Sequence, residues 1–141
     1  MRGAHCWQRV TGFWLLRTER MQRQILHGKI HGATVTDARI DYEGSITIDS
    51  KLLEAADILP GEKVLIANLT NASRIESYAM AGKPGSGEVC LNGGAAQYGK
   101  KGDKVIIMSF AVLTDDEIKR HKPRVVRVTA KNEMIPVTVK V

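Results

Sequence analysis

From residue 21 onward, apolar and polar residues mostly alternate along the chain, as they do in β-strands that bury one face. Some longer apolar runs are typical of strands buried on both faces. These stretches predict strands at residues 24–31, 33–42, 45–49, 62–69, 74–81, 88–93, 103–113 and 124–130. Residues 135–141 are expected to pair with the last of these strands as a hairpin. The pattern therefore predicts a mainly β fold.

Two stretches break this alternation and predict short helices. Residues 49–59 place leucines and alanines at helical spacing, with Asp49 or Ser50 as the N-cap and Pro60 as the stop. Residues 114–117, Thr-Asp-Asp-Glu, have the sequence of a capping box and predict one further helical turn.

The chain contains one internal similarity. PGEKVLI (60–66) and KGDKVII (101–107) share a glycine, an acidic residue, Lys-Val and further apolar positions. Two similar halves around a pseudo-twofold axis would produce this repetition, and so would coincidence between two turn–strand junctions. Many short strands and few helices favour a small closed or nearly closed β-barrel, because closure removes exposed strand edges.

Composition places the chain among soluble globular proteins. Its 141 residues are 43% apolar and 26% charged, which suits one compact domain with its own core. No apolar run approaches the ~20 residues that a membrane span needs, so no membrane partner is expected. Cys6 and Cys90 provide neither a disulfide framework nor a zinc-binding spacing. These cysteines fit a reducing compartment, and we expect a cytoplasmic protein.

Residues 1–20 differ from the rest of the chain. They lack a clean hydrophobic period, and they carry four arginines against one glutamate, which accounts for +3 of the net charge of +6. We expect this segment to be an N-terminal extension, either a disordered tail or the product of an upstream start codon. The remaining +3 is spread among charges of both signs, so no nucleic-acid partner is expected.

Histidines do not form a metal site in this pattern. His27 and His31 share one face of a predicted strand, but neither has a carboxylate or cysteine at metal-ligand spacing. We therefore expect no bound metal.

The Gly44-Ser45 pair joins two predicted strands and permits two interpretations. A Gly-Ser pair is common in hairpin turns. Alternatively, the serine hydroxyl attacks the preceding carbonyl carbon and converts the peptide bond into an ester. β-Elimination from that ester breaks the chain and leaves a dehydroalanine that hydrolyses to a pyruvoyl group. The pair taken alone favours the turn.

Two other stretches could carry chemistry. Arg74 and Tyr78 point to the same face of their predicted strand, either as a solvated surface or as a carboxylate-binding fork beside a phenol acid. Residues 92–96, Asn-Gly-Gly-Ala-Ala, either make a tight turn or present backbone N–H groups to an oxyanion.

These features occur together in one known family. From Met21, the chain resembles the pyruvoyl-dependent aspartate 1-decarboxylases of bacteria, over nearly all of residues 21–141. The matching stretches are LHGKIH (26–31), VTDARIDYEGSITID (35–49), LLEAADILPGEKV (52–64), NLTNASRIESYA (68–79), LNGGAAQYGKKGDKVII (91–107) and NEMIPV (132–137). The resemblance implies one domain at 21–141, a double-psi β-barrel with short helices. It also implies a homotetramer with active sites between neighbouring subunits.

The resemblance implies an activity as well. The precursor cuts itself between Gly44 and Ser45, so that a β chain ends at Gly44 and an α chain begins with a pyruvoyl group derived from Ser45. This covalent ketone forms a Schiff base with L-aspartate and removes the α-carboxyl group as CO2. The product is β-alanine, which leads to pantothenate and coenzyme A.

Residue roles follow from the same resemblance. Arg74 is expected to grip a substrate carboxylate, and Tyr78 to donate a proton after CO2 leaves. Lys29 offers a positive charge near the site, while Tyr42 and His31 line it. The carbonyl at the cleavage point, and later the ketone, are expected to be held by Asn92 with the backbone of Gly93, Gly94 and Ala95.

One position departs from the family pattern. Ser77 stands where many members have a threonine whose hydroxyl polarises the Gly44 carbonyl during cleavage. Serine keeps the hydroxyl but lacks the methyl group that restricts the threonine rotamer. We therefore expect slower self-cleavage, or greater dependence on a maturation helper protein.

The alternative function is a non-enzymatic small β-barrel of the DNA-binding regulator type. Such a protein needs clustered basic residues or stacking aromatic residues. The basic residues after position 20 are scattered instead, so this alternative ranks second.

Overall fold

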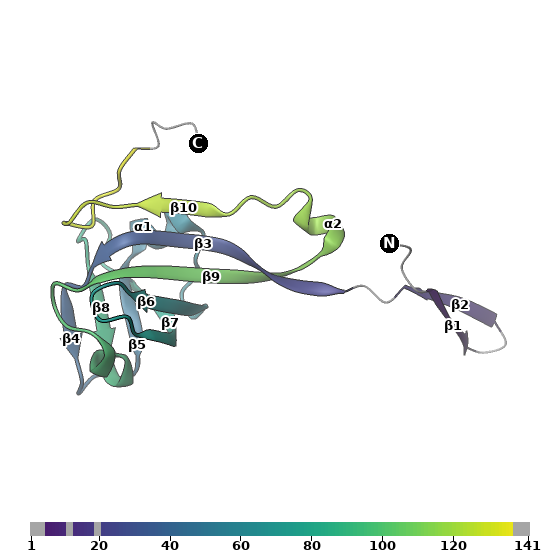
Figure 1. Cartoon of the computed structure of the whole chain (residues 1–141), viewed down its shortest axis with the longest axis horizontal. Coiled ribbons are helices and arrows are strands. Elements are labelled where there is room, and N and C mark those ends of the chain that lie inside the picture. The colour runs from purple at the N-terminus through teal and green to yellow at the C-terminus, as the bar shows by residue number, and fades with distance from the viewer. Residues whose placement is uncertain (1–4, 11–12, 19–20, 137–141) are drawn as a thin grey trace. The chain divides into compact units, whose positions relative to one another are not determined.

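The computed structural model describes residues 5–10, 13–18 and 21–136 (Figure 1). Strands dominate and the helices are short, so the mainly β class is confirmed. In chain order the elements are β1 His5–Val10, β2 Phe13–Thr18, β3 Gln22–Thr34, β4 Asp37–Arg39, β5 Ser45–Asp49, α1 Ser50–Ala56, β6 Lys63–Asn68, β7 Arg74–Gly82, β8 Val89–Asn92, the 3-10 helix η1 Gly93–Tyr98, β9 Lys104–Thr114, α2 Asp115–Ile118 and β10 Arg124–Arg127. In the described part of the chain, no helix has the length and apolar character needed to span a bilayer.

One compact unit comprises Met1–Ile25 and Ala111–His121. In it, β1 and β2 pair as an antiparallel two-stranded sheet. The predicted capping box is confirmed at the start of α2, where the Thr114 side chain accepts from the Glu117 N–H and the Glu117 side chain accepts from the Thr114 N–H. Two strands thus occupy much of residues 1–20, and the extension predicted there stays a prediction.

The second unit comprises Leu26–Phe110 and Lys122–Val141 and contains the main core. The eight-stranded sheet has the order β10-β3-β9-β6-β7-β5-β8-β4. Pairing is parallel for β10 with β3, β5 with β7 and β4 with β8, and antiparallel for β6 with β7 and β9, and for β5 with β8. This mixed sheet joins strands far apart in the sequence into a barrel-like fold. The largest fully buried apolar side chains of the core are Ile30, Ile46, Ile48, Leu52, Leu91 and Ile107.

The two similar heptapeptides become equivalent neighbours in this sheet. β6 and β9 pair antiparallel with Ile66 opposite Ile107, which are the last residues of the two repeats. The turns before them use Gly61 and Gly102, whose φ values of +85° and +94° lie in the left-handed region that favours glycine. Each repeat therefore supplies the same turn and the same kind of buried strand.

Several predicted segments need correction. The single strand predicted over 33–42 is wrong, because residues 33–34 belong to β3, residues 35–36 lie in no strand, and β4 covers only Asp37–Arg39. Beyond Arg39 the Tyr42 N–H donates to the Arg39 carbonyl at 3.3 Å and turns the chain. The helix predicted over 49–59 ends at Ala56, because Asp57 adopts a left-handed φ of 53°.

The strand predicted over 135–141 falls partly on residues 137–141, which lie outside the described residues. Residues 135–136 lie in no strand, although the Ile135 N–H donates to the Arg127 carbonyl at 2.8 Å next to an isolated antiparallel bridge between Val128 and Met134.

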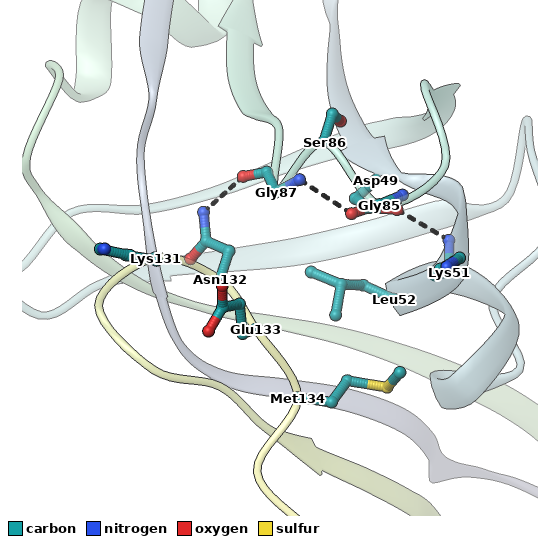
Figure 2. A pocket seen from close by; sticks show the side chains of 10 residues that line it. All are labelled: Asp49, Lys51, Leu52, Gly85, Ser86, Gly87, Lys131, Asn132, Glu133 and Met134. Atoms are coloured by element: carbon teal, nitrogen blue, oxygen red, sulfur yellow. Dashed lines mark hydrogen bonds between the residues drawn. The ribbon is translucent and has the colours of Figure 1, made fainter.

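Asp49 connects β5, α1 and the loop before β8 (Figure 2). Its carboxylate is 3% exposed and accepts hydrogen bonds from the backbone N–H groups of Lys51, Gly85 and Gly87 at 2.9, 3.0 and 2.9 Å. Burial opposes its ionisation, but these three donors outweigh burial and lower the pKa of the Asp49 carboxyl. The predicted N-cap is therefore Asp49 rather than Ser50, and it also holds the glycine-rich loop that precedes β8.

We expect Asp49→Asn to lower the free energy of unfolding by about 1–3 kcal/mol at pH 7, because an amide cannot accept all three bonds as an anion does. Since the folded-state pKa is lowered, the stabilisation is present in full above the ordinary aspartate pKa of 3.8 and is lost as the pH falls through the folded value. Urea unfolding at several pH values measures this difference.

The matched control is Glu54→Gln, an exposed carboxylate on the same helix, α1. It should change the unfolding free energy by less than ~0.5 kcal/mol. An Asp49→Asn deficit that persists unchanged in acid would contradict the role assigned to the carboxylate charge.

Candidate active site

The start of β5 and the end of β8 bring a serine and an amide together. The two strands pair antiparallel with Ser45 opposite Asn92, so both side chains lie on one side of the sheet. Both are nearly inaccessible, at 5% and 2% exposed. Asn92 Nδ2 donates to Ser45 Oγ at 3.0 Å and to Thr47 Oγ1 at 2.9 Å. The Ser45 hydroxyl is therefore held in place beside its own backbone.

Gly93 allows the chain to approach the Gly44–Ser45 peptide closely. Its φ of +57° lies in the left-handed region. A Cβ at this position would lie 2.7 Å from the N and Cα atoms of Gly44 and 2.7 Å from the Tyr42 carbonyl oxygen. Only a residue without a side chain fits there, so η1 begins in direct contact with the backbone that precedes Ser45.

A pocket of about 300 Å³ opens beside Ser45. It brings together five of the residues predicted for the site: Tyr42, Gly44, Ser45, Tyr78 and Asn92. The two tyrosines are 61% and 42% exposed, so their rings form the outer part of the pocket while the serine lies at its base.

The outer face of β7 has the predicted alternation. Arg74, Glu76 and Tyr78 are exposed, whereas Ile75 and Ser77 between them are half-buried. Glu76 Oε2 lies 2.8 Å from Lys63 Nζ in an exposed ion pair. Tyr78 lines the Ser45 pocket, and Arg74, four residues earlier, does not.

Lys29 and His31 lie on β3 and are partly buried. Neither lines the pocket of its own chain. In the parallel register of β3 with β10, His31 lies opposite Arg127. Burial lowers the pKa of His31, and the positive charges of Lys29 and Arg127 lower it further. His31 is therefore biased toward the neutral form within a positively charged strip of the sheet.

The remaining predicted residues, Ser77, Gly94 and Ala95, are not among those that line the pocket. Ser77 pairs with Val64 on the half-buried face of β7. Ala95 is buried in η1, and Gly94 is exposed there. The structure places both in the short helix that follows Asn92, and none of the three lines the pocket.

Sequence reasoning missed several residues of the site. Arg39, Thr47, Met80 and Glu88 also line the pocket. Arg39 Nε donates to Asp37 Oδ2 at 2.9 Å, and this bond lowers the pKa of the Asp37 carboxyl. Thr47 could have been found, because a residue two positions after Ser45 on a strand must share its face. The same alternation places Met80 on the face of Tyr78, whereas the pattern contained no such signal for Arg39 or Glu88.

Among the described residues, no group of three or more His, Cys, Asp or Glu side chains is placed to hold a metal ion. The site is instead a buried serine at a strand start, held by an amide and packed against glycine backbone. This arrangement defines a class of barrel-like, mainly β protein with a buried, amide-bonded serine hydroxyl at the start of a strand.

Comparison with known proteins agrees with this class. The chain belongs to the aspartate decarboxylase family, whose model matches residues 21–135. It is 54% identical over 114 residues to an aspartate 1-decarboxylase of Listeria monocytogenes, a match that covers 81% of this chain and 90% of the relative. The enzymes of the same name from Thermoanaerobacter pseudethanolicus and Dehalococcoides mccartyi are 49% and 50% identical, over 82% and 80% of this chain and 98% and 91% of the relatives.

We expect Gly93→Ala to lower the free energy of unfolding by about 2–4 kcal/mol, because the new Cβ would overlap the Gly44 backbone and the left-handed φ disfavours alanine. Chemical denaturation of the purified protein measures the loss.

Gly94→Ala is the matched control, since a Cβ at Gly94 meets nothing within 4 Å. This neighbouring change should leave stability within about 0.5 kcal/mol of the parent protein. Equal stability of the two variants would show that Gly93 does not pack against Gly44 as described.

Proposed function

We propose that this chain is a self-processing, pyruvoyl-dependent aspartate 1-decarboxylase that converts L-aspartate to β-alanine and CO2. Family membership supports the reaction. The observation that carries the proposal is the buried Ser45 hydroxyl, bonded to Asn92 Nδ2 at 3.0 Å beside a Gly44 backbone that Gly93 packs against. The biosynthetic role is the supply of β-alanine for pantothenate and coenzyme A, in the cytoplasm.

This geometry supports the following route for the proposed self-cleavage. Ser45 Oγ attacks the Gly44 carbonyl carbon, and its hydroxyl proton passes to the nitrogen of residue 45. The C–N bond between the two residues then breaks, which frees this nitrogen as an amine and leaves the Gly44 acyl group on Ser45 Oγ as an ester. Loss of the Ser45 α-proton then breaks the Cβ–Oγ bond, and Oγ departs as part of the Gly44 carboxylate. The resulting dehydroalanine takes up water and releases ammonia, which leaves a pyruvoyl group at the head of β5.

The surroundings of Ser45 fit this covalent cofactor. When formed, the pyruvoyl ketone would condense with the substrate amine and accept the electrons released as CO2 leaves. It would lie at the base of a 300 Å³ pocket, a suitable volume for a small amino acid. Asn92 Nδ2 is positioned to donate to an oxygen at this point, and the exposed Tyr78 hydroxyl can deliver a proton from the outer side.

Substrate binding requires positive charge for two carboxylates. We assign the firm clamp on the retained carboxylate to Arg74, and a further charge to Lys29. Because Arg74, Lys29 and His31 do not line the Ser45 pocket of their own chain, we propose a homotetramer in which they reach a neighbouring subunit's pocket. Exposed apolar side chains near the pocket, such as Met80 at 44%, support burial of this face between subunits.

The catalytic domain in this proposal is residues 21–141, and residues 1–20 form an extension. The family model supports this boundary because it begins at residue 21. The serine at position 77 is an argument for slow or assisted maturation. A serine side chain lacks the methyl group that restricts the χ1 rotamers of threonine, so its hydroxyl is less often in the required position. A helper protein is therefore included as a proposed partner.

Ser45→Ala tests the proposed function. The purified parent protein should run as two chains on a denaturing gel, with an α chain that intact mass spectrometry identifies as pyruvoyl-blocked. Ser45→Ala should stay a single chain and form no β-alanine, because it has no nucleophile.

The chain offers a matched control in its second Gly-Ser pair, Gly85-Ser86, which lies in an exposed loop. Ser86→Ala should be processed like the parent. A parent protein that remains uncut at Gly44–Ser45 after prolonged warming would remove support for the pyruvoyl mechanism.

Arg74→Ala should leave cleavage intact and reduce kcat/KM for L-aspartate by roughly 10²- to 10⁴-fold, the effect of losing two charge-assisted hydrogen bonds. Arg74→Lys should recover only part of this loss, because lysine keeps the charge but not the planar fork. Steady-state kinetics on fully processed protein measures both. Normal turnover by Arg74→Ala would exclude Arg74 from the site.

A further inference from the structure

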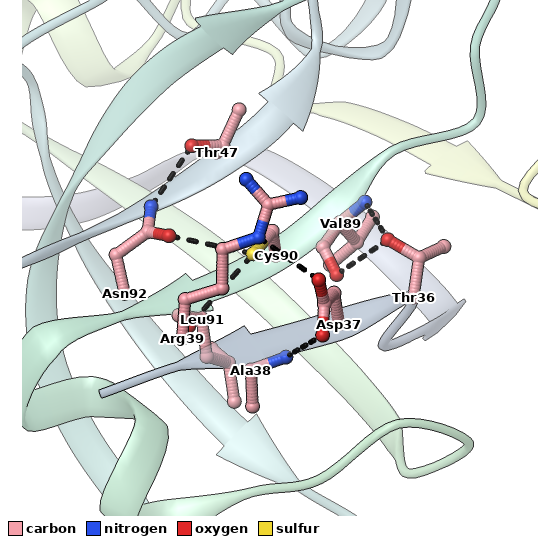
Figure 3. A network of polar contacts seen from close by, with 9 residues as sticks. All are labelled: Thr36, Asp37, Ala38, Arg39, Thr47, Val89, Cys90, Leu91 and Asn92. Atoms are coloured by element: carbon pink, nitrogen blue, oxygen red, sulfur yellow. Dashed lines mark hydrogen bonds and ion pairs between the residues drawn. The ribbon is translucent and has the colours of Figure 1, made fainter. Parts of the chain in front are cut away.

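The Ser45–Asn92 contact belongs to a longer chain of hydrogen bonds on β5 and β8. Figure 3 shows the part of this chain that joins Thr47, Asn92 and Cys90. Thr47 lies directly opposite Cys90 in the antiparallel register, two pairs along from Ser45 and Asn92 and therefore on the same face. Asn92 Nδ2 reaches both Ser45 Oγ and Thr47 Oγ1, and the Cys90 thiol donates to Asn92 Oδ1 at 3.3 Å. Every polar atom of the Asn92 side chain is therefore paired.

These partners distinguish the two ends of the Asn92 amide. An asparagine side chain has a donating NH2 group at one end and an accepting oxygen at the other, and it can rotate by half a turn about its last bond. The reversed orientation would place the NH2 group against Cys90 Sγ, which is a weak acceptor. In the observed orientation a thiol proton meets an oxygen, and both N–H bonds meet hydroxyl oxygens.

The thiol is suited to act as the donor. Cys90 is 1% exposed, and burial raises the pKa of its thiol, so the S–H proton is retained at neutral pH. Its other acceptor, the Leu91 carbonyl, is farther away at 3.8 Å. Cys90 does not line the pocket and has no contact with Ser45 in these hydrogen bonds, so any effect on the serine passes through Asn92.

We propose that Thr47 and Cys90 are positioning residues for self-cleavage, because together they hold the Asn92 amide with its NH2 group on Ser45 Oγ. This inference rests on the proposed function. The Nδ2–H bond to Oγ stabilises that oxygen when it leaves Cβ as part of the Gly44 carboxylate. If the amide rotates, elimination slows. Water then has more time to hydrolyse the same ester, which restores Ser45 Oγ–H and leaves an α chain that begins with serine instead of pyruvoyl.

Four variants of freshly made, uncut precursor test this proposal. Cys90→Ala and Thr47→Val remove the two partners at nearly constant shape, whereas Cys90→Ser and Thr47→Ser keep a hydroxyl at each position. The first pair should cleave about 5- to 10-fold more slowly, the effect of one hydrogen bond on a rate, and should yield more serine-headed α chain. The second pair should resemble the parent in rate and product.

Intact mass spectrometry follows the rate and the α-chain terminus together, and urea unfolding of each precursor identifies any loss of stability. A merely structural role would change stability without changing the ratio of serine-headed to pyruvoyl-headed α chain. Parental rates and products in Cys90→Ala and Thr47→Val would overturn the inference while the proposed function stands. So would a Cys90→Ser variant that matches Cys90→Ala. An uncut parent protein would instead overturn the proposed function, and this inference with it.

Discussion

The antiparallel pairing of β5 with β8 is the constraint on which the site depends. It places Ser45 opposite Asn92, and a shift of one residue in this register would turn both side chains to the other face of the sheet. The register is fixed from both sides, because β5 also pairs in parallel with β7 through Ile46 and Ala79. β7 in turn presents Tyr78 beside the serine. Three strands from distant parts of the sequence thus determine the geometry around one peptide bond.

Glycine and buried polar groups complete this arrangement in different ways. Gly93 has no side chain, and this leaves room for the Gly44 backbone to pack against it. Asp49 contributes by holding the far end of β5 to the loop that leads into β8. The two ends of the short strand β5 are therefore held by unrelated interactions, one steric and one electrostatic. Neither depends on the pocket-facing side chains, which leaves those free to serve chemistry.

Much of the fold could be predicted from the sequence because most of its strands alternate or form short apolar runs and its turns carry clear signals. The capping box at Thr114 and the glycine turns at Gly61 and Gly102 are local features, and local features can be read from neighbouring residues. The stretch after Arg39 misled the prediction, because Ile40 and Tyr42 continue an alternating pattern although the backbone turns there. Alternation describes a preference for burial, and in this loop both side chains are instead exposed.

The site was harder to predict than the fold. Ser45, Asn92 and Tyr78 could be named through a family resemblance, but the hydrogen bonds that join Ser45 and Thr47 to Asn92 could not. Thr47 reaches Asn92 only through the register of β5 with β8, which no short sequence window contains. Cys90 lies two residues before Asn92 on the same strand, so strand alternation could have placed the two on one face. Arg39 enters the pocket because β4 pairs in parallel with β8, a long-range contact of the same kind. Residues that act through pairing across a sheet leave little trace in linear order.

The position of Gly44–Ser45 within the topology has a consequence for the self-cleavage that we propose. β3 and β4 precede this bond, whereas their partners β10 and β8 follow it. Cutting the chain there would leave these strand pairs in place but turn an intramolecular association into one between two polypeptides. An uncut chain can refold at a rate independent of its concentration, while a cut protein would first have to bring two fragments together. The proposed cleavage would thus make recovery from denaturation harder as the protein is diluted.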